Sequence, residues 1–313
     1  MIEVSHLTKR YGDHTAVEDL SFTIPGRQIY GLLGPNGAGK STTMNILTGC
    51  LSATAGEVRI DGVDIFEDPM SAKRHLGYLP EQPPVYMDRT PLEYLRFVAR
   101  AKGVKNIREE IDRVMALTQI TDMKDRLIKN LSKGYRQRVG LAQAILGDPD
   151  IIILDEPTVG LDPRQITEIR DLIVTLGKDK TVILSSHILS EVQAVCGTIL
   201  ILSKGHLVAC DTPENLEKQM SGTSALELEV KASPEEAERI LKALPDVHSC
   251  TCKALSGRTQ VRLETDKDKL DGLSEAVFFA LSDAGRPLYS MTHAKASLED
   301  IFLELTDGKE QGK

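Results

Sequence analysis

Apolar and polar residues alternate in the first part of the chain. Ile2 and Val4 are separated by a polar residue, and so are Leu20, Phe22 and Ile24. A period of two residues is typical of strands that bury one face and expose the other. Residues 1–60 therefore predict an antiparallel β subdomain.

Further along, short apolar runs alternate with segments of helical periodicity. The runs Ile29–Leu33, Ile151–Leu154 and Val182–Leu184 have the length of buried strands. A helix is expected from Asp162 and Pro163, a favourable N-cap and first-turn pair. Its apolar residues share one face: Ile166, Ile169, Ile173 and Leu176. Strands separated by helices predict an α/β fold with helices packed on a parallel sheet.

A lobe of helices is expected within this fold. Residues 91–145 have mostly helical periodicity and lie between the runs Ile29–Leu33 and Ile151–Leu154. They predict a helical lobe inserted into the α/β domain.

The end of the chain has a different pattern. Residues 216–224 contain Ser, Gly and Thr and indicate a linker. After it, strand patterns alternate with two amphipathic helices, the first of which opens with a capping box of Ser233 and Glu236. The order βαββαβ, followed by a last helix from Ser297, predicts a small ferredoxin-like α+β domain.

The length and composition fit a globular protein of two domains. The chain has 313 residues, of which 41% are hydrophobic and 27% charged, and we expect domains at residues 1–220 and 221–313. No run approaches the roughly 18 apolar residues that a membrane-spanning helix needs, and no signal-peptide pattern opens the chain. We therefore expect a cytoplasmic protein whose five cysteines are ordinary reduced residues.

The net charge of −8 argues against partners that are recognised through a positive field. The last third of the chain also carries more acidic than basic residues. Nucleic acids and anionic lipids are bound by basic surfaces. We therefore expect no nucleic-acid partner.

A glycine-rich loop joins the predicted strand Ile29–Leu33 to a helix. Glycines allow successive backbone N–H groups to converge on phosphate oxygens, and the helix N-terminus adds positive potential. In such a loop Lys40 reaches the β- and γ-phosphates, and the Ser41 hydroxyl ligates Mg²⁺. The predicted site for a nucleoside triphosphate comprises Gly34, Pro35, Asn36, Gly37, Ala38, Gly39, Lys40, Ser41 and the adjacent Thr42.

Two acids follow the buried strand Ile151–Leu154. A strand that ends in an acid places the carboxylate at the carboxyl edge of the sheet, where ligands of such sheets bind. Asp155 is expected to hold Mg²⁺, and Glu156 to polarise the attacking water as a general base. Alone, such a pair usually marks a solvent-facing strand end, but beside a phosphate loop the functional interpretation is the stronger one.

A third motif stands shortly before the acidic strand, with the sequence Leu131-Ser132-Lys133-Gly134-Tyr135-Arg136-Gln137-Arg138. In isolation it indicates a helix that starts with Ser132 as N-cap. In series with the phosphate loop and the two acids, it resembles the LSGGQ signature of ATP-binding cassettes. Residues 1 to about 220 thus resemble the ATP-binding subunit of an ABC transporter. Gly160–Pro163 and Ser297–Leu305 resemble its type 2, exporter-like branch.

The resemblance implies a phosphate-loop ATPase cassette that binds ATP and Mg²⁺ between two copies packed head to tail. Tyr11 would stack on adenine, and His187 would touch the γ-phosphate. Ser132 and Gly134 would meet the γ-phosphate bound by the other copy, and Asp162 would lie in the loop that reaches across the dimer. We expect a homodimer of cassettes that drives export through a separate transmembrane permease, at the cytoplasmic face of the membrane.

Two positions depart from the family pattern. The usual glutamine of the Q-loop is replaced by Glu81, and Gln82 follows one place later. Either residue is therefore a candidate for contact with the metal and the attacking water. The third signature residue is Lys133 instead of glycine. Ser132 and Gly134 are intact, so we expect function to survive.

Two other interpretations are open at this point. A cassette protein of translation or DNA repair usually carries two cassettes, zinc ligands or a long coiled coil, and none of these is visible in the sequence. Residues 225–305 could form a small-ligand sensor that regulates the ATPase, although a packing or dimer-stabilising appendage is the simpler interpretation.

Overall fold

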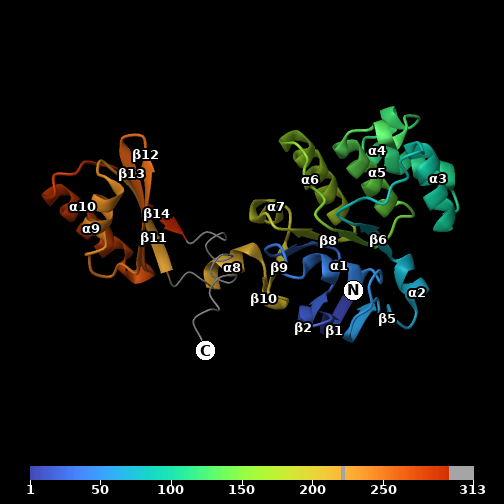
Figure 1. Ribbon diagram of the computed structural model, residues 1–313, viewed down its shortest axis with the longest axis horizontal. Helices are drawn as coiled ribbons and strands as arrows, with labels where there is room; N and C mark the ends of the chain where they lie inside the picture. The colour runs from blue at the N-terminus through green and yellow to red at the C-terminus, as the bar shows by residue number, and fades with distance from the viewer. Residues whose placement is uncertain (220–222, 296–313) are drawn as a thin grey trace. The chain divides into compact units, whose positions relative to one another are not determined.

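The computed structural model describes residues 1–219 and 223–295 (Figure 1). The chain divides into two compact units, Met1–Thr212 and Pro213–Lys313. Each unit has its own sheet structure and its own apolar core.

The stretch 216–224, which indicated a linker, contains more regular structure than its composition suggested. Helix α8 (Pro213–Gln219) covers its first part, and strand β11 begins at Thr223. The domain ranges 1–220 and 221–313 stay a prediction.

An antiparallel sheet lies at the start of the first unit, as the alternating pattern predicted. Strand β1 pairs with β2 on one side and with β4 on the other. Ile2, Val4, Leu20 and Ile24 are buried, while the polar residues between them face outward to different extents. The strand order is β2-β1-β4-β5, with bounds β1 Ile2–Tyr11, β2 His14–Ile24, β4 Ala55–Ile60 and β5 Val63–Asp64.

A second, mostly parallel sheet forms the centre of this unit. Its strands are β10 (His206–Asp211), β9 (Thr198–Ser203), β3 (Ile29–Leu33), β8 (Thr181–Ser186), β7 (Ile151–Leu154) and β6 (Leu76–Leu79), in that order. All pairs are parallel except β10 with β9. Strands β3 and β7 are buried along their whole length, as the continuous apolar runs predicted. Because parallel strands end at one edge, the residues after β3, β6, β7 and β8 are brought together there.

Helices cover this sheet, with bounds α1 Lys40–Leu47, α2 Pro69–Arg74, α6 Pro163–Gly177 and α7 Leu189–Gln193. Helix α1 ends at Leu47 with Thr48 as its C-cap, and Gly49 follows with φ 62°, a left-handed conformation that suits a helix C-terminus. Asp162 caps α6 by accepting from the N–H of Gln165 at 2.9 Å, with Pro163 in the first turn. The start of this helix is therefore as predicted.

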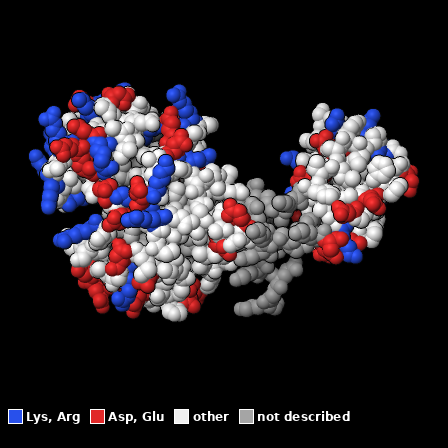
Figure 2. Space-filling view, turned by 180° about the vertical axis from the view of Figure 1, so that it is seen from behind, with Lys and Arg blue, Asp and Glu red and all other residues white. Residues whose placement is uncertain are grey.

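The predicted helical lobe is present between β6 and β7. It consists of α3 (Pro91–Ala101), α4 (Ile107–Leu117), α5 (Lys133–Ile145) and the short 3₁₀ turns Thr121–Met123 and Ile128–Asn130. Thr90 and Glu93 form a capping box at the start of α3. Figure 1 shows the lobe in green at one end of the first unit and the antiparallel sheet in blue at the other. In Figure 2, basic and acidic side chains are interspersed on this unit.

The second unit has the predicted βαββαβ order in its described part. Its antiparallel sheet has the strand order β12-β13-β11-β14, which is that of a ferredoxin-like domain. The apolar stripes of both helices pack on one core with the sheet. The bounds are β11 Thr223–Val230, α9 Pro234–Leu241, β12 Ser249–Leu255, β13 Arg258–Asp266, α10 Leu270–Asp283 and β14 Leu288–Lys295, with a 3₁₀ turn at Lys267–Lys269.

Two predictions for the second unit, the capping box at Ser233 and the helix from Ser297, are not seen in the described residues. Ser233 caps α9 by accepting from the N–H of Glu236. The Glu236 carboxylate accepts from the guanidinium of Arg286 at 2.6 Å instead of completing the predicted capping box. A charged partner from another element therefore replaces the local backbone bond. The helix predicted from Ser297 lies outside the described residues.

Candidate functional site

The glycine-rich loop lies between β3 and α1, where the motif predicted it. Gly39 has φ 101°, and a Cβ at this position would lie 2.6 Å from the carbonyl oxygen of Ala16. Both the backbone conformation and the close approach of β2 therefore require glycine. Helix α1 begins at the next residue, Lys40, whose side chain is 6% exposed and whose Nζ donates to the carbonyl oxygen of Gly34 at 2.7 Å.

Asp155 follows directly after β7 and is 2% exposed. Its Oδ1 accepts from Ser41 Oγ at 3.2 Å and from Ser185 Oγ at 2.6 Å. Ser185 also accepts from the backbone N–H of Glu156 at 2.9 Å, so one buried hydroxyl holds both acids. Burial, and to a lesser degree the charge of Asp155, raises the pKa of the neighbouring Tyr78 phenol.

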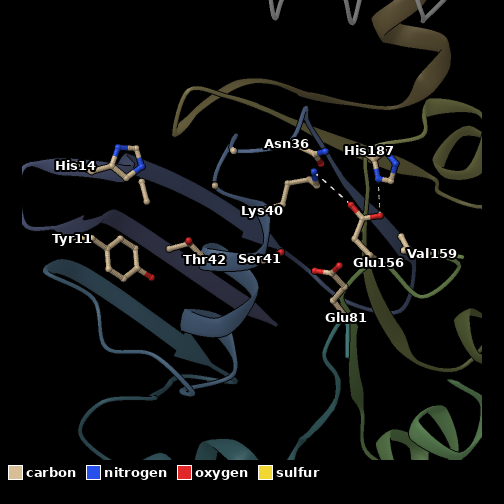
Figure 3. Close-up of a pocket in the computed structure, with 13 residues that line it drawn as sticks. Tyr11, His14, Asn36, Lys40, Ser41, Thr42, Glu81, Glu156, Val159 and His187 are labelled. Atoms are coloured by element: carbon tan, nitrogen blue, oxygen red, sulfur yellow. Dashed lines mark hydrogen bonds and ion pairs between the residues drawn. The ribbon is translucent and has the colours of Figure 1, made fainter. Parts of the chain in front are cut away.

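Glu156 lies between two basic side chains. Its Oε1 lies 3.5 Å from Lys40 Nζ, and its Oε2 lies 3.0 Å from His187 Nδ1 (Figure 3). Glu156 has φ 48°, a left-handed conformation that costs a non-glycine residue free energy. The carboxylate is therefore held in a fixed direction, with a histidine from the end of β8 on one side and the loop lysine on the other.

A pocket of about 450 Å³ at the carboxyl edge of the parallel sheet is lined by Lys40, Ser41, Glu156 and His187, whereas Asp155 and Gly34 do not line it. Tyr11 and His14, which pair across the β1–β2 turn, lie at the end of the pocket away from Glu156 in Figure 3. The lining residues are Tyr11, His14, Ala16, Asn36, Gly37, Gly39, Lys40, Ser41, Thr42, Glu81, Glu156, Val159 and His187. The structure thus brings together the loop, Glu156, His187 and Tyr11.

The two candidate Q-loop residues, Glu81 and Gln82, differ in which pockets they line. Glu81 lines the pocket that contains Lys40 and Ser41. Gln82 lines a neighbouring pocket of about 390 Å³, together with Lys133 and other residues. Glu81 lines both pockets, because it lies where they adjoin.

The signature residues Ser132 and Gly134 lie at the start of α5 and do not line the phosphate-loop pocket. Ser132 caps α5 by accepting from the N–H of Tyr135, as the sequence predicted. A Cβ at Gly134 would lie 2.4 Å from Gln165 Oε1, so this helix packs tightly against the start of α6. Among the described residues that line the phosphate-loop pocket, Ser132, Gly134 and Asp162 do not occur.

Oxygen donors suited to a hard divalent cation lie on and behind the wall of the pocket, because Ser41 lines it and the buried Asp155 contacts Ser41. Ser41 Oγ and Asp155 Oδ1 are 3.2 Å apart. No cluster of three or more His, Cys, Asp and Glu side chains in the described ranges could hold a metal ion without other ligands. A cation here would therefore need further oxygens, of the kind that phosphate groups supply.

Comparison with known proteins identifies the family. The family model described as "ABC transporter" matches residues 17–159. The uncharacterised ABC transporter ATP-binding protein YhcH of Bacillus subtilis (strain 168) is 36% identical, over 98% of this chain and 96% of YhcH. This chain belongs to the family of ABC transporter ATP-binding proteins. As a member of the family, the cassette is an ATP-binding protein and an ATP hydrolase.

Two further similarities concern a relative with a named process and a solved structure. The Nod factor export ATP-binding protein I of Cupriavidus metallidurans is 30% identical to the cassette, over 98% of this chain and 97% of that protein. A bacterial ABC transporter cassette solved as a dimer is 26% identical with a TM-score of 0.63, over 68% of this chain and 98% of the other. The predicted family and the phosphate-loop ATPase fold are confirmed.

Sequence reasoning missed several residues in and around the cassette's pocket. Ser185, which holds both acids without lining the pocket, was not predicted, although a hydroxyl at the end of a buried strand beside an acid-bearing strand could have indicated contact with the acids. His14 lies opposite Tyr11 in the antiparallel pair, which the Gly12-Asp13 turn signal could have indicated. Val159 had no comparable signal. No helix in the described ranges is long and apolar enough to cross a membrane.

Proposed function

We propose that this chain is the motor subunit of an exporter. Paired with a second copy, it binds and hydrolyses ATP at the cytoplasmic face of the membrane and drives export through a permease on a separate chain. The observation that carries the proposal is the convergence of Lys40, Ser41, Glu156 and His187 in one pocket. The relative named as a Nod factor export protein, which matches nearly the full chain, supports the direction of transport.

The pocket fits a nucleotide laid along its length. The loop N–H groups and Lys40 hold the phosphates at the end where α1 begins, since both carry positive potential. Tyr11 is 48% exposed at the other end and offers a ring face for adenine. Thr42 lies between these ends in Figure 3, and Asn36 lies beside Lys40.

Ser41 and Asp155 are proposed as the protein ligands of Mg²⁺. The Ser41 hydroxyl faces the phosphate end, and Asp155 is fixed behind it by Ser185. This donor set fits, because Mg²⁺ in nucleotide sites takes one or two protein oxygens with phosphates and waters. When bound, the ion neutralises charge that develops on the phosphate oxygens.

Glu156 is proposed as the general base of hydrolysis. It accepts a proton from the water that attacks the γ-phosphorus, while the bond to the bridging oxygen breaks and ADP leaves. Lys40 and His187 hold the carboxylate in place and lie where they can also contact the γ-phosphate. The strained backbone at Glu156 directs the side chain into the pocket.

The site is proposed to be completed by a second copy of the chain. Ser132, Gly134 and Asp162 do not line the pocket of their own chain in the described ranges. In a head-to-tail pair these residues would close over the triphosphate of the other copy. The similar cassette solved as a dimer supports this arrangement.

The base assignment is tested with Glu156→Gln. The amide keeps the size of the side chain but cannot take a proton, so ATP binding should be retained. Turnover should fall on the order of 10²–10⁴-fold, the usual effect of losing a general base. ATPase rate and ATP affinity are measured on the same preparation, and Glu109→Gln, an exposed residue of α4, serves as the matched control. Near-normal turnover of Glu156→Gln would reject the assignment.

A further inference from the structure

The carboxylate of Glu81 lies where the family pattern has a neutral amide, and the structure places it in the nucleotide pocket. Glu81 is two residues beyond β6, and the N–H of Asp155 donates to the carbonyl oxygen of Leu79 at 2.8 Å. The ends of β6 and β7 are therefore tied side by side. In Figure 3 the Glu81 carboxylate points into the space between Ser41 and Glu156.

Glu81 differs from the other two acids at this edge in having no basic or hydroxyl partner. Glu156 contacts Lys40 and His187, and Asp155 accepts from two hydroxyls. Within the described ranges, no residue forms an ion pair or hydrogen bond with the Glu81 side chain, and the residue is exposed to the pocket. A negative charge is therefore free to act on whatever binds beside Ser41.

Gln82 is poorly placed for the same task. Residues 81 and 82 lie in a bend after β6, not in a strand. Gln82 lines the adjoining pocket with Lys133, whereas Glu81 also lines the pocket of Lys40 and Ser41, which Gln82 does not.

We propose that Glu81 makes nucleotide binding strongly dependent on a divalent cation. The inference rests on the proposed function, which places the γ-phosphate beside Lys40 and Ser41. Without a cation, the Glu81 carboxylate and the phosphate repel each other. With Mg²⁺ bound, Glu81 would join Ser41 and Asp155 in holding the ion, directly or through water, and the cation would offset the repulsion. The glutamate thus admits the metal–nucleotide complex and rejects the free nucleotide.

The proposal predicts opposite effects of Glu81→Gln in the two conditions. ATP affinity of the full chain is measured by equilibrium titration in EDTA and in Mg²⁺. In EDTA the variant should bind ATP more tightly than the unaltered chain, because the repulsion is gone. In Mg²⁺ the variant should bind ATP with an affinity equal to or lower than that of the unaltered chain. The ratio of the ATP affinity in Mg²⁺ to that in EDTA should fall by roughly tenfold, which is within the range of coupling between two ligands.

Three variants besides Glu81→Gln make the result decisive. Glu109→Gln removes an exposed carboxylate of α4 and should leave the ratio unchanged. An unchanged ratio in Glu81→Gln overturns the inference, and so does a fall in the ratio caused by Gln82→Ala instead. Lys40→Ala tests the proposed function separately. If that variant still binds ATP fully, the nucleotide lies elsewhere; if it loses binding while Glu81→Gln has no effect, only the inference about Glu81 is wrong.

Discussion

At the scale of single residues, Ser185 controls the geometry of both acids. Its hydroxyl is completely buried, donates to Asp155 and accepts from the backbone of Glu156. The second bond helps to hold Glu156 in its left-handed conformation, which would otherwise relax. Metal ligand and base are therefore oriented by a residue that need not touch the nucleotide.

Replacing this hydroxyl should impair hydrolysis more than binding. In Ser185→Ala the two acids lose a shared anchor, and a misplacement of about 1 Å can cost on the order of 10²-fold in rate. We expect turnover to fall roughly 10- to 100-fold while ATP affinity changes little. The matched control is Ser186→Ala, because Ser186 is equally buried but bonds to Glu191. An equal loss of turnover in both variants would show that Ser185 acts only through stability.

At the scale of elements, the contact of β6 with α5 positions the Q-loop. A Cβ at Gly77 would lie 2.1 Å from the carbonyl oxygen of Ala144, so the two backbones touch. Gln143 Nε2 also donates to the carbonyl oxygen of Tyr78 at 2.6 Å. Because Glu81 is only two residues beyond β6, its place in the pocket depends on this close packing of a lobe helix on the sheet.

Adding one methyl group at this contact should be costly. Gly77→Ala forces β6 and α5 apart, and overpacking of this kind costs about 1–3 kcal/mol. The matched control is Gly272→Ala in α10, where the added methyl meets open space and a helical alanine should gain about 0.5 kcal/mol. Thermal unfolding of the full chain measures both, and the transition that shifts with Mg²⁺ and ATP belongs to the cassette. A Gly77→Ala chain with unchanged melting would contradict the close contact.

At the scale of the whole molecule, the cassette is half of a proposed pair. Its signature residues do not line its own nucleotide pocket in the described ranges, and its first unit resembles a cassette solved as a dimer. Ser132 is exposed at the start of α5 and is free to face a second copy. The triphosphate would then lie between the two chains and hold them together.

Association should therefore depend on ATP and on the space at Ser132. Sedimentation of Glu156→Gln with saturating ATP is expected to give a dimer, because the nucleotide is not consumed. Adding Ser132→Arg should abolish it, since the larger side chain obstructs the interface. Two controls are made in the Glu156→Gln chain. Ser132→Ala removes the same N-cap without adding bulk, and Ser5→Arg adds the same charge at an exposed position of β1. Both chains should still form the dimer with ATP. A Glu156→Gln chain that stays monomeric with ATP would contradict the sandwich.

Much of the fold followed from local pattern because its causes are local. The period of two near Ile2, the buried run Ile151–Leu154 and the caps at Ser132 and Asp162 each depend on a few neighbouring residues. The phosphate loop is also contiguous, since its chemistry comes from adjacent backbone N–H groups and the helix that follows. The ferredoxin-like order of the second unit came from the sequence of elements alone.

Other features depend on contacts between residues far apart in the chain. Ser185 reaches Asp155 because β7 and β8 are neighbours in register, which no window of sequence contains. Whether Glu81 or Gln82 lines the pocket of Lys40 and Ser41 depends on how β6 packs against α5 and on the direction of the chain after β6. Sequence periodicity identifies which face of an element is buried, but the partner across that face is chosen by packing and charge when the whole chain folds.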